Sequence, residues 1–471
     1  MNLSKSILLV LFCGMILTLS QSFGQQSAQS LPNIVFVLAD DMAWADVGYN
    51  GQQYFETPNI DALTVDGMRF DQAYSGASVC SPSRACLISG MYSPRHHIYH
   101  PGNRARGKVE YMKLAVPNRE VKNDTYDWFQ AIGELDPGVN SLAKVLKPAG
   151  YTTARIGKWH VGEDEQGFDY SMDIHKGWND KASAKKLTDA GIAFIREHTE
   201  QPFFLYLAHH EVHKPLVADS ALIEKYKEKK RTTGGDFNPI YAAMVEATDT
   251  SVGRLREELR KLGLEDNTLF IFASDNGGFP DATSNLPLYG YKGTLFEGGI
   301  RIPTSMVWPG HISPGSSCDT PITFVDYLPT FAEIAGTSLD QSAHPVDGLS
   351  ILPLMQGNAL PERAIFWHFP LYADLDHGVY PGTFPVLGTD HMYWRGVPAT
   401  VIRRGNYKLI YYYEDQSVKL FDVLNDMGES RDLSMEQPEI TKKLLAELKA
   451  WTSTVEAPVP DRVNPLFNPN E

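Results

Sequence analysis

Four oxygen-bearing side chains are the first candidates for chemistry in this chain of 471 residues. Asp40 and Asp41 are adjacent, and Asp275 and Asn276 form a second adjacent pair. Neighbouring carboxylates repel each other, and a turn or a helix cap would need only one of them. Carboxylate and amide oxygens are the ligands that Ca²⁺ and Mg²⁺ prefer, whereas zinc and copper favour nitrogen and sulfur. These side chains therefore predict a site for a hard divalent cation.

A second stretch with chemical potential runs from Cys80 to Gly90. Pro82 restricts the backbone after the thiol, and the Ser83 hydroxyl and the Arg84 guanidinium follow within one turn. The closing Gly90 predicts a short helix that packs inward and ends there. Taken alone, a cysteine is more often a small buried hydrophobic residue than a nucleophile, so both interpretations stay open at this point.

Cationic side chains form the third group. Most isolated lysines are solvated surface charges, but Lys158 lies between Gly157 and Trp159 directly after an apolar run. Histidine exchanges a proton near neutral pH, which suits acid–base chemistry. His209 and His210 either line a pocket or are hydrogen-bonded core residues, and both alternatives remain. The candidates of this group are Lys158, His160, His209, His210, His213 and Lys292.

Apolar runs of β-rich composition precede most of these clusters. They occupy residues 33–39, 151–156, 203–208 and 268–273, and helical patterns lie between them at 140–147, 182–198 and 244–262. Strands that alternate with helices predict an α/β domain with a large, mostly parallel sheet. Ligands of such sheets bind beyond the carboxyl ends of the strands. The four clusters are therefore expected to converge at one edge of the sheet.

The chain changes character near residue 355. Strand patterns at 364–368, 400–404, 407–411 and 419–422, with the turn signal Gly405–Asn406, predict an antiparallel sheet after a long loop at 370–397. An amphipathic helix is expected over 439–451. We predict a catalytic α/β domain at 25–355 and a smaller C-terminal α+β subdomain at 356–471.

Residues 1–24 have the pattern of a secretory signal peptide, with Lys5 before an apolar run. No other stretch is apolar enough to span a bilayer, so we expect a bacterial protein that is exported to the periplasm or secreted, without stable membrane insertion. A net charge of −15 excludes binding to nucleic acid through the overall field. Cys86 and Cys318 could form a disulfide, but we favour two free, buried thiols.

The stretch from Cys80 to Gly90 resembles the signature of the type I sulfatases, Cys-x-Pro-Ser-Arg followed by Leu, Ser or Thr, and Gly. Similar family strings recur along the chain from Pro32 to about Trp451, so the resemblance implies the alkaline-phosphatase-like fold. These further strings are Gly157–His160, His213–Pro215, Tyr291–Arg301 and, in the small subdomain, Leu420–Asp426.

The resemblance also implies roles for single residues. Cys80 would be converted to formylglycine (3-oxoalanine) by a maturation enzyme, and the hydrated aldehyde would be the nucleophile and a metal ligand. Lys158 and Lys292 would bind the sulfate, His160 would take the diol proton, and His213 would protonate the leaving oxygen. Arg84 would hold the hydrate, and Arg301 would pair with Glu297 or with an active-site carboxylate. The implied metal is Ca²⁺, with Mg²⁺ as the less favoured alternative, and its ligands are Asp40, Asp41, Cys80, Asp275 and Asn276.

Three functions compete. The first is hydrolysis of sulfate esters in a sulfated carbohydrate, with an algal or other environmental glycan slightly preferred over a glycosaminoglycan. The second is a phosphonate or phosphate diester hydrolase of the same superfamily, and the third is an inactive glycan-binding homologue. The carbohydrate hypothesis uses aromatic and basic residues in loops expected at the pocket rim, although any one of them is more often a packing residue. These are Arg95, His96, His97, Tyr99, His100, Arg104, Trp128, Tyr289, His368, Tyr372, His391 and Trp394.

Overall fold

The computed structural model describes residues 31–101, 112–114, 133–173, 180, 183–280, 282–342, 344–373, 384–385, 392–393 and 396–468. The predicted signal peptide and the rim candidates Arg104, Trp128, His391 and Trp394 lie outside these residues. The chain from Leu31 onward forms one compact unit. Among the described residues, no helix is both long and apolar enough to cross a membrane.

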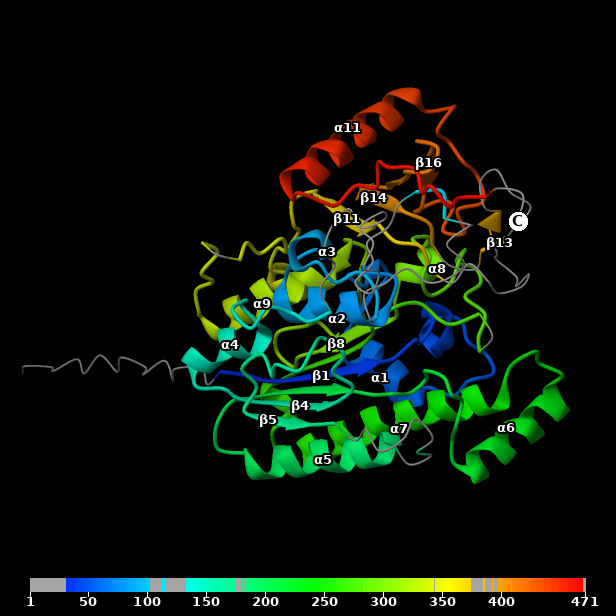
Figure 1. Ribbon diagram of the computed structural model, residues 1–471. Helices are drawn as coiled ribbons and strands as arrows, with labels where there is room; N and C mark the ends of the chain where they lie inside the picture. Colours follow the sequence, from blue (N-terminus) through cyan, green and yellow to red (C-terminus); the bar gives the residue numbers. More distant parts are fainter. Residues whose placement is uncertain are drawn as a thin grey trace, which may run out of the picture. The chain divides into compact units, whose positions relative to one another are not determined.

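A mixed, mostly parallel sheet of eight strands forms the centre of this unit (Figure 1). The predicted strands β1, β4, β6 and β7 are neighbours in it and run parallel to one another. The predicted α/β fold is thus confirmed, and β8 is the antiparallel exception beside β7. The strand order is β5 (Tyr170–Met172), β4 (Thr152–Gly157), β6 (Phe203–Ala208), β1 (Asn33–Ala39), β7 (Thr268–Ser274), β8 (Thr304–Val307), β2 (Met68–Phe70) and β9 (Ser316–Cys318).

Strand β1 shows why the sheet is covered on both sides. Its alternate residues enter two different cores, so that Ile34 and Phe36 pack on one face and Val35 and Val37 on the other. Burying such a side chain stabilises the fold by roughly 1.5–3 kcal/mol. A strand that is apolar at every position therefore needs helices on both faces.

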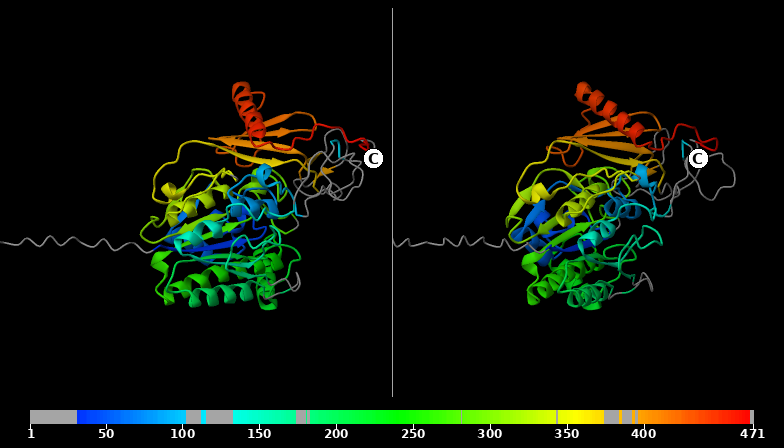
Figure 2. Two further views of the ribbon diagram at one scale, coloured as in Figure 1. Left: turned by 60° about the vertical axis from the view of Figure 1, so that its left-hand side comes forward. Right: turned by 90° about the vertical axis from the view of Figure 1, so that its left-hand side faces the viewer.

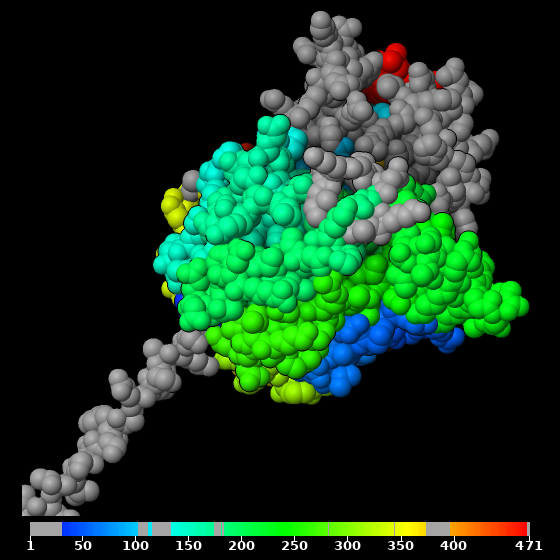
Figure 3. Space-filling view, turned by 90° about the horizontal axis from the view of Figure 1, so that it is seen from below, coloured from blue at the N-terminus to red at the C-terminus, as the bar shows by residue number. Residues whose placement is uncertain are grey.

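The helices supply these two layers. The cores place α1, α5 and α7 on one face of the sheet and α2, α4 and α9 on the other, as Figures 1 and 2 show. Figure 3 shows the outer side of the first layer, where residues in the green of α5, α6 and α7 form a broad part of the surface. The helices are α1 (Pro58–Asp66), α2 (Cys80–Ser89), α3 (Ser93–His96), α4 (Leu142–Leu146), α5 (Ser183–Glu197), α6 (Ser220–Thr233), α7 (Pro239–Lys261), α8 (Glu297–Ile300), α9 (Tyr327–Ala335), α10 (Leu352–Met355) and α11 (Pro438–Thr454).

The C-terminal residues form the predicted antiparallel sheet of four strands, in the order β11 (Ala364–Phe369), β14 (Ala399–Arg404), β15 (Tyr407–Tyr412) and β16 (Val418–Asp422). Its outer face packs against α11 through Leu444 and Leu448 (Figure 2). Its inner face shares a core with residues of the α/β part, including Tyr74 and Ile300. Short pairs of strands complete the described structure: β3 (Ala73–Tyr74) with β10 (Ile322–Thr323), and β12 (Phe384–Pro385) with β13 (Met392–Tyr393) inside the predicted loop.

Candidate active site

The carboxyl ends of four adjacent strands carry the predicted clusters to one edge of the sheet. Ala39 at the end of β1 pairs with Ser274 of β7, and Gly157 of β4 pairs with Ala208 of β6. The residues that follow these strand ends are therefore neighbours across the sheet, although the chain separates the first and the last by more than two hundred positions. The structure therefore confirms that the four clusters lie at one edge of the sheet.

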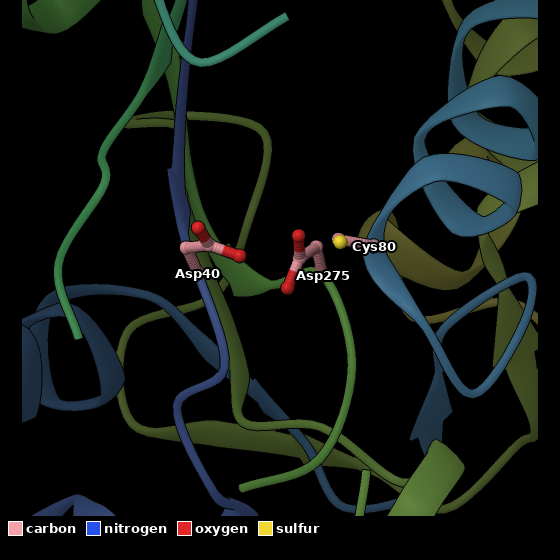
Figure 4. Close-up of side chains that lie close together, drawn as sticks. All are labelled: Asp40, Cys80 and Asp275. Atoms are coloured by element: carbon pink, nitrogen blue, oxygen red, sulfur yellow. The ribbon is translucent and has the colours of Figure 1, made fainter. Parts of the chain in front are cut away.

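Asp40, Cys80 and Asp275 meet at this edge (Figure 4). One ligand atom from each lies within 4.8 Å of the others, and all three side chains are buried. The two carboxylates extend from the ends of β1 and β7, and the thiol extends from the first turn of α2 toward Asp275. Three anionic or ionisable groups do not gather in a dry place without a cationic partner.

The donor atoms fit a hard divalent cation. Asp40 Oδ1 and Asn276 Oδ1 are buried and accept no hydrogen bond from the described protein atoms. A buried acceptor that lacks a donor costs free energy, and a cation bound by oxygen would satisfy both atoms at once. The residues that would hold it are Asp40, Asp275, Asn276 and the oxygen that a modified Cys80 would offer, and Asp41 stays a predicted ligand.

Asp41 completes the group in a different way. It has a left-handed backbone with φ of 65°, and its carboxylate accepts hydrogen bonds from Lys292 Nζ at 2.7 Å and from Asn276 Nδ2 at 2.8 Å. Its own amide donates to Asp275 Oδ1 at 3.1 Å. Asp41 thereby connects the two acidic pairs and Lys292, and it lies outside the tightest cluster of donor atoms.

Charge balance around Asp40 and Asp275 is incomplete in the protein alone. Burial opposes ionisation of Asp40. The positive charges of Lys158, whose Nζ lies 2.5 Å from Asp40 Oδ2, and of His213 and Arg84 together outweigh burial, so the pKa of Asp40 falls well below its usual value. Burial and the charge of Asp40 raise the pKa of Asp275 to about 8 despite the Arg84 guanidinium at 2.8 Å. A dication at this position would favour the ionised form of both carboxylates.

Helix α2 fixes the thiol and the guanidinium. All ten of its residues are buried, and Gly90 ends it at φ of 68° with its amide bonded to Cys86 O, as the sequence predicts. Arg84 donates to Asp275 Oδ2 and, at 2.7 Å, to Lys158 O. Burial opposes ionisation of Cys80, yet Lys158 and Lys292 together lower the pKa of its thiol. Cys86 and Cys318 are free and buried, as favoured from the sequence.

The four candidate histidines lie in different environments. Burial, followed by the charges of Lys158 and Arg84, lowers the pKa of His160 to about 3, so this imidazole is neutral near pH 7. The side chain of His213 is 24% exposed and its Nε2 lies 3.6 Å from Asp41 Oδ2, which places it at the open side of the cluster. His209 is fully buried and its Nε2 contacts Ser251 Oγ at 2.9 Å, so the core alternative holds for it. His210 is partly exposed beside Asp173.

Several expected rim residues are packing residues instead. His96, Tyr99, His100, His368 and Tyr372 are buried, and the expectation that they rim a pocket is wrong. Three of them have polar partners inside the protein: His96 Nδ1 accepts from the Ile98 amide at 3.1 Å, His368 Nδ1 contacts Thr400 Oγ1 at 2.7 Å, and Tyr372 Oη donates to Glu414 Oε1 at 2.6 Å. Amphipathic side chains of this kind occur both at rims and in cores, so residue type alone does not distinguish the two.

Sequence reasoning missed Asp46 and Lys408, which support the site. Asp46 is fully buried behind Asp41 and holds the Ala43 amide and the Tyr241 hydroxyl. It follows the acidic pair within one short segment, and that third acid was the available signal. Glu297 pairs with Arg301 at 3.4 Å, which was one of the predicted alternatives, but it also pairs with Lys408. No sequence signal connects residues so far apart.

Comparisons with known proteins find related sequences and structures. The family model described as Sulfatase matches residues 32–337. A protein of Formosa agariphila named "Sulfatase" is 30% identical over 97% of this chain and 94% of its own length. Mouse N-acetylgalactosamine-6-sulfatase is 31% identical over 72% of this chain and 68% of its own length. The crystal structure of Ps i-CgsB in complex with k-i-k-neocarrahexaose has a TM-score of 0.72 and 26% identity, and covers 92% of this chain and 95% of that one.

Proposed function

The chain belongs to the sulfatase family and is a sulfuric ester hydrolase, and from this premise we propose that it removes sulfate from oligosaccharides of a sulfated polysaccharide. The observation that carries the proposal is the buried cluster of Asp40, Cys80 and Asp275 with two unsatisfied oxygens beside it. Such a site suits a substrate group with several negatively charged oxygens, because cations surround it on the protein side.

Cys80 would act as formylglycine, and the bound metal would be Ca²⁺. The modified side chain supplies the attacking oxygen, and the cation supplies positive charge where the sulfate oxygens lie. An encoded thiol would be a poor ligand for a hard cation, whereas a hydrated aldehyde offers oxygen. Lys158 and Lys292 lower the pKa of the Cys80 thiol although burial opposes its ionisation, which supports a negatively charged nucleophile at this position.

The remaining catalytic roles fall to side chains of the protein itself. Lys158 and Lys292 would bind the sulfate oxygens. Arg84 would hold the carboxylates and the nucleophile in their relative positions. His213 would protonate the leaving oxygen, because it is the partly exposed histidine at the open side of the cluster. His160 would accept a proton from the nucleophile, because its neutral imidazole has a nitrogen with a free lone pair.

The substrate class is supported by relatives rather than by the site. Ps i-CgsB was crystallised with a neocarrahexaose, and the mouse relative carries the name of a sulfated amino sugar. We propose a sulfated galactan oligosaccharide as the first candidate and a glycosaminoglycan as the second. An exported protein would meet such polymers outside the cell.

A direct experiment compares a panel of defined sulfated oligosaccharides, with sulfate release as the measurement. The enzyme is produced with and without a formylglycine-generating enzyme, and mass spectrometry of the peptide that contains Cys80 measures conversion. Activity should follow the converted fraction, and Cys80→Ala should abolish turnover while the protein stays folded. Turnover near the wild-type level in that variant would overturn the mechanism.

A second measurement separates the competing reaction. A sulfate ester and a phosphate diester of the same chromogenic alcohol are compared under identical conditions, with Ca²⁺ or Mg²⁺ added after chelation. We expect the sulfate ester to be preferred, and Ca²⁺ to restore more activity than Mg²⁺. A large preference for the diester would reject sulfate hydrolysis as the main activity.

A further inference from the structure

Lys408 is a fully buried cation between the C-terminal sheet and helix α8. Its Nζ lies 3.0 Å from Glu297 Oε1 and 2.9 Å from Glu429 Oε1, and none of these side chains is exposed. Lys408 belongs to β15 and Glu429 follows β16, whereas Glu297 is the first residue of α8. Burying charges costs free energy unless each charge has a well-placed partner. An apolar contact would attach the C-terminal sheet to α8 without this cost.

The cluster holds Glu297 from several directions. Tyr74 Oη donates to Glu297 Oε2 at 2.8 Å, and Arg403 Nη1 donates to the same hydroxyl at 2.8 Å. The amide of Glu297 donates to Glu429 Oε2 at 2.6 Å. Apolar side chains surround the charges and strengthen these contacts by excluding water; they include Phe296, Ile300, Trp367 and Phe421.

Helix α8 in turn touches three of the segments that carry the candidate active site. Gly277, next to Asn276, donates its amide to Gly299 O at 3.0 Å. Gly298 donates to Tyr289 O at 2.7 Å, at the start of the loop that carries Lys292. Ser75, just before α2, donates to Ile300 O at 2.9 Å. One short helix thus joins the ends of the metal, sulfate and nucleophile segments.

The backbone of α8 packs too closely against its neighbours for either to shift alone. A Cβ on Gly277 would lie 1.9 Å from Gly298 O, and a Cβ on Gly298 would lie 2.2 Å from Gly290 O. Asn285 Nδ2 adds hydrogen bonds to the carbonyls of Gly290 and Gly298 at 2.9 and 3.0 Å. A displacement of α8 must therefore move the Asn276 turn and the Lys292 loop with it.

We propose that Lys408 and Glu429 are positioning residues of the active site: the C-terminal sheet fixes α8 through them, and α8 fixes Lys292 and the Asn276 turn. The part that concerns sulfate binding rests on the proposed function, whereas the mechanical part does not. The competing explanation is that the cluster only attaches the C-terminal sheet.

The test compares Lys408→Met with a matched control on the same sheet. Arg404 lies on the opposite face of this sheet and pairs with Glu447 of α11, so Arg404→Met removes an ion pair without touching α8. Hydrogen–deuterium exchange of residues 275–300 is measured by mass spectrometry, together with the kcat and KM of sulfate release. In Lys408→Met we expect exchange of this segment to accelerate at least tenfold and kcat to fall at least tenfold, with both unchanged in Arg404→Met.

Glu429 provides the second pair of variants if Lys408→Met does not fold. Glu429→Gln keeps an acceptor for the Glu297 amide and should restore protection, whereas Glu429→Ala should not. Wild-type exchange of residues 275–300 in either Lys408→Met or Glu429→Ala overturns the inference, as does equal acceleration in Arg404→Met. If the wild-type protein releases no sulfate while the exchange result holds, the proposed function fails and the positioning role stands.

Discussion

Asp46→Asn tests the electrostatics of the region behind the acidic pair. Asp46 is fully buried, and its carboxylate accepts hydrogen bonds from the Ala43 amide at 2.8 Å, the Tyr241 hydroxyl at 2.5 Å and the Thr283 hydroxyl at 2.6 Å. All three donors are neutral. Burial is therefore the dominant effect, and it raises the pKa of Asp46 from 3.8 to about 7.

The sign of the pH dependence follows from proton binding. Between pH 3.8 and about 7 the folded protein keeps a proton on Asp46 that the unfolded chain has released. The free energy of unfolding therefore falls as the pH rises, by ~1.4 kcal/mol per pH unit. Over the interval between the two pKa values this amounts to roughly 4 kcal/mol. The stabilisation is fully present below the unfolded pKa and is lost as the pH rises through the folded pKa.

An amide at this position cannot titrate, so Asp46→Asn should lack this part of the slope. We would measure the free energy of unfolding by urea denaturation, followed by tryptophan fluorescence, from about pH 4 to about pH 8. Over this range the free energy of unfolding of the variant should rise by about 4 kcal/mol relative to that of the wild type. Asp266→Asn, at an exposed position, controls for the loss of one negative charge. A difference between Asp46→Asn and wild type that is constant with pH would refute a buried, neutral Asp46.

Three further variants test the site. Arg84→Met should destabilise the protein by about 3–5 kcal/mol in urea denaturation and abolish turnover, because it leaves buried carboxylates without their cation; unchanged stability would contradict this. Gly298→Ala should lower kcat and the melting temperature, because its Cβ would meet Gly290 O at 2.2 Å; wild-type kinetics would count against the tight packing of α8. His213→Gln should slow desulfation of a sugar sulfate by about 10²–10⁴-fold but affect a nitrophenyl sulfate much less, because an acidic alcohol needs little protonation; equal losses on both esters would exclude the acid role.

The sequence was sufficient for the centre of the sheet. Strand β1 occupies the predicted residues 33–39 and β6 the predicted 203–208, because both are continuous apolar runs bounded by polar residues. The predicted ends of helices were less reliable where the apolar pattern and the capping residues indicate different starting positions. Helix α7 begins at Pro239, after the Asn238 cap, and not at 244 where its apolar pattern becomes regular. The cap and the proline were the signals that mark this start.

Short strands and long-range partners were beyond the sequence. β2, β8 and β9 have three or four residues each, too few for a periodicity, and their pairing depends on the strands already beside them. The clusters at the strand ends could be predicted because the parallel sheet gathers them. The pairing of Lys408 with Glu297 could not, because it depends on how the C-terminal sheet lies against α8. For the same reason, His96 and Tyr372 could not be recognised as interior residues.

Strand β1 has a consequence for the order in which the protein assembles during synthesis. It emerges early, but both of its partners lie far downstream, since Ala39 pairs with Ser274. At about 5–20 residues per second, roughly 10–50 s of translation separate these two residues. During that interval β1 lacks first both partner strands and then, once β6 is made, still lacks β7, so its unpaired edge and apolar side chains are a target for chaperones. The thiol of Cys80, 1% exposed in the finished fold, is synthesised within the same interval. We therefore expect a modifying enzyme to reach it on the growing chain, before the sheet closes over it.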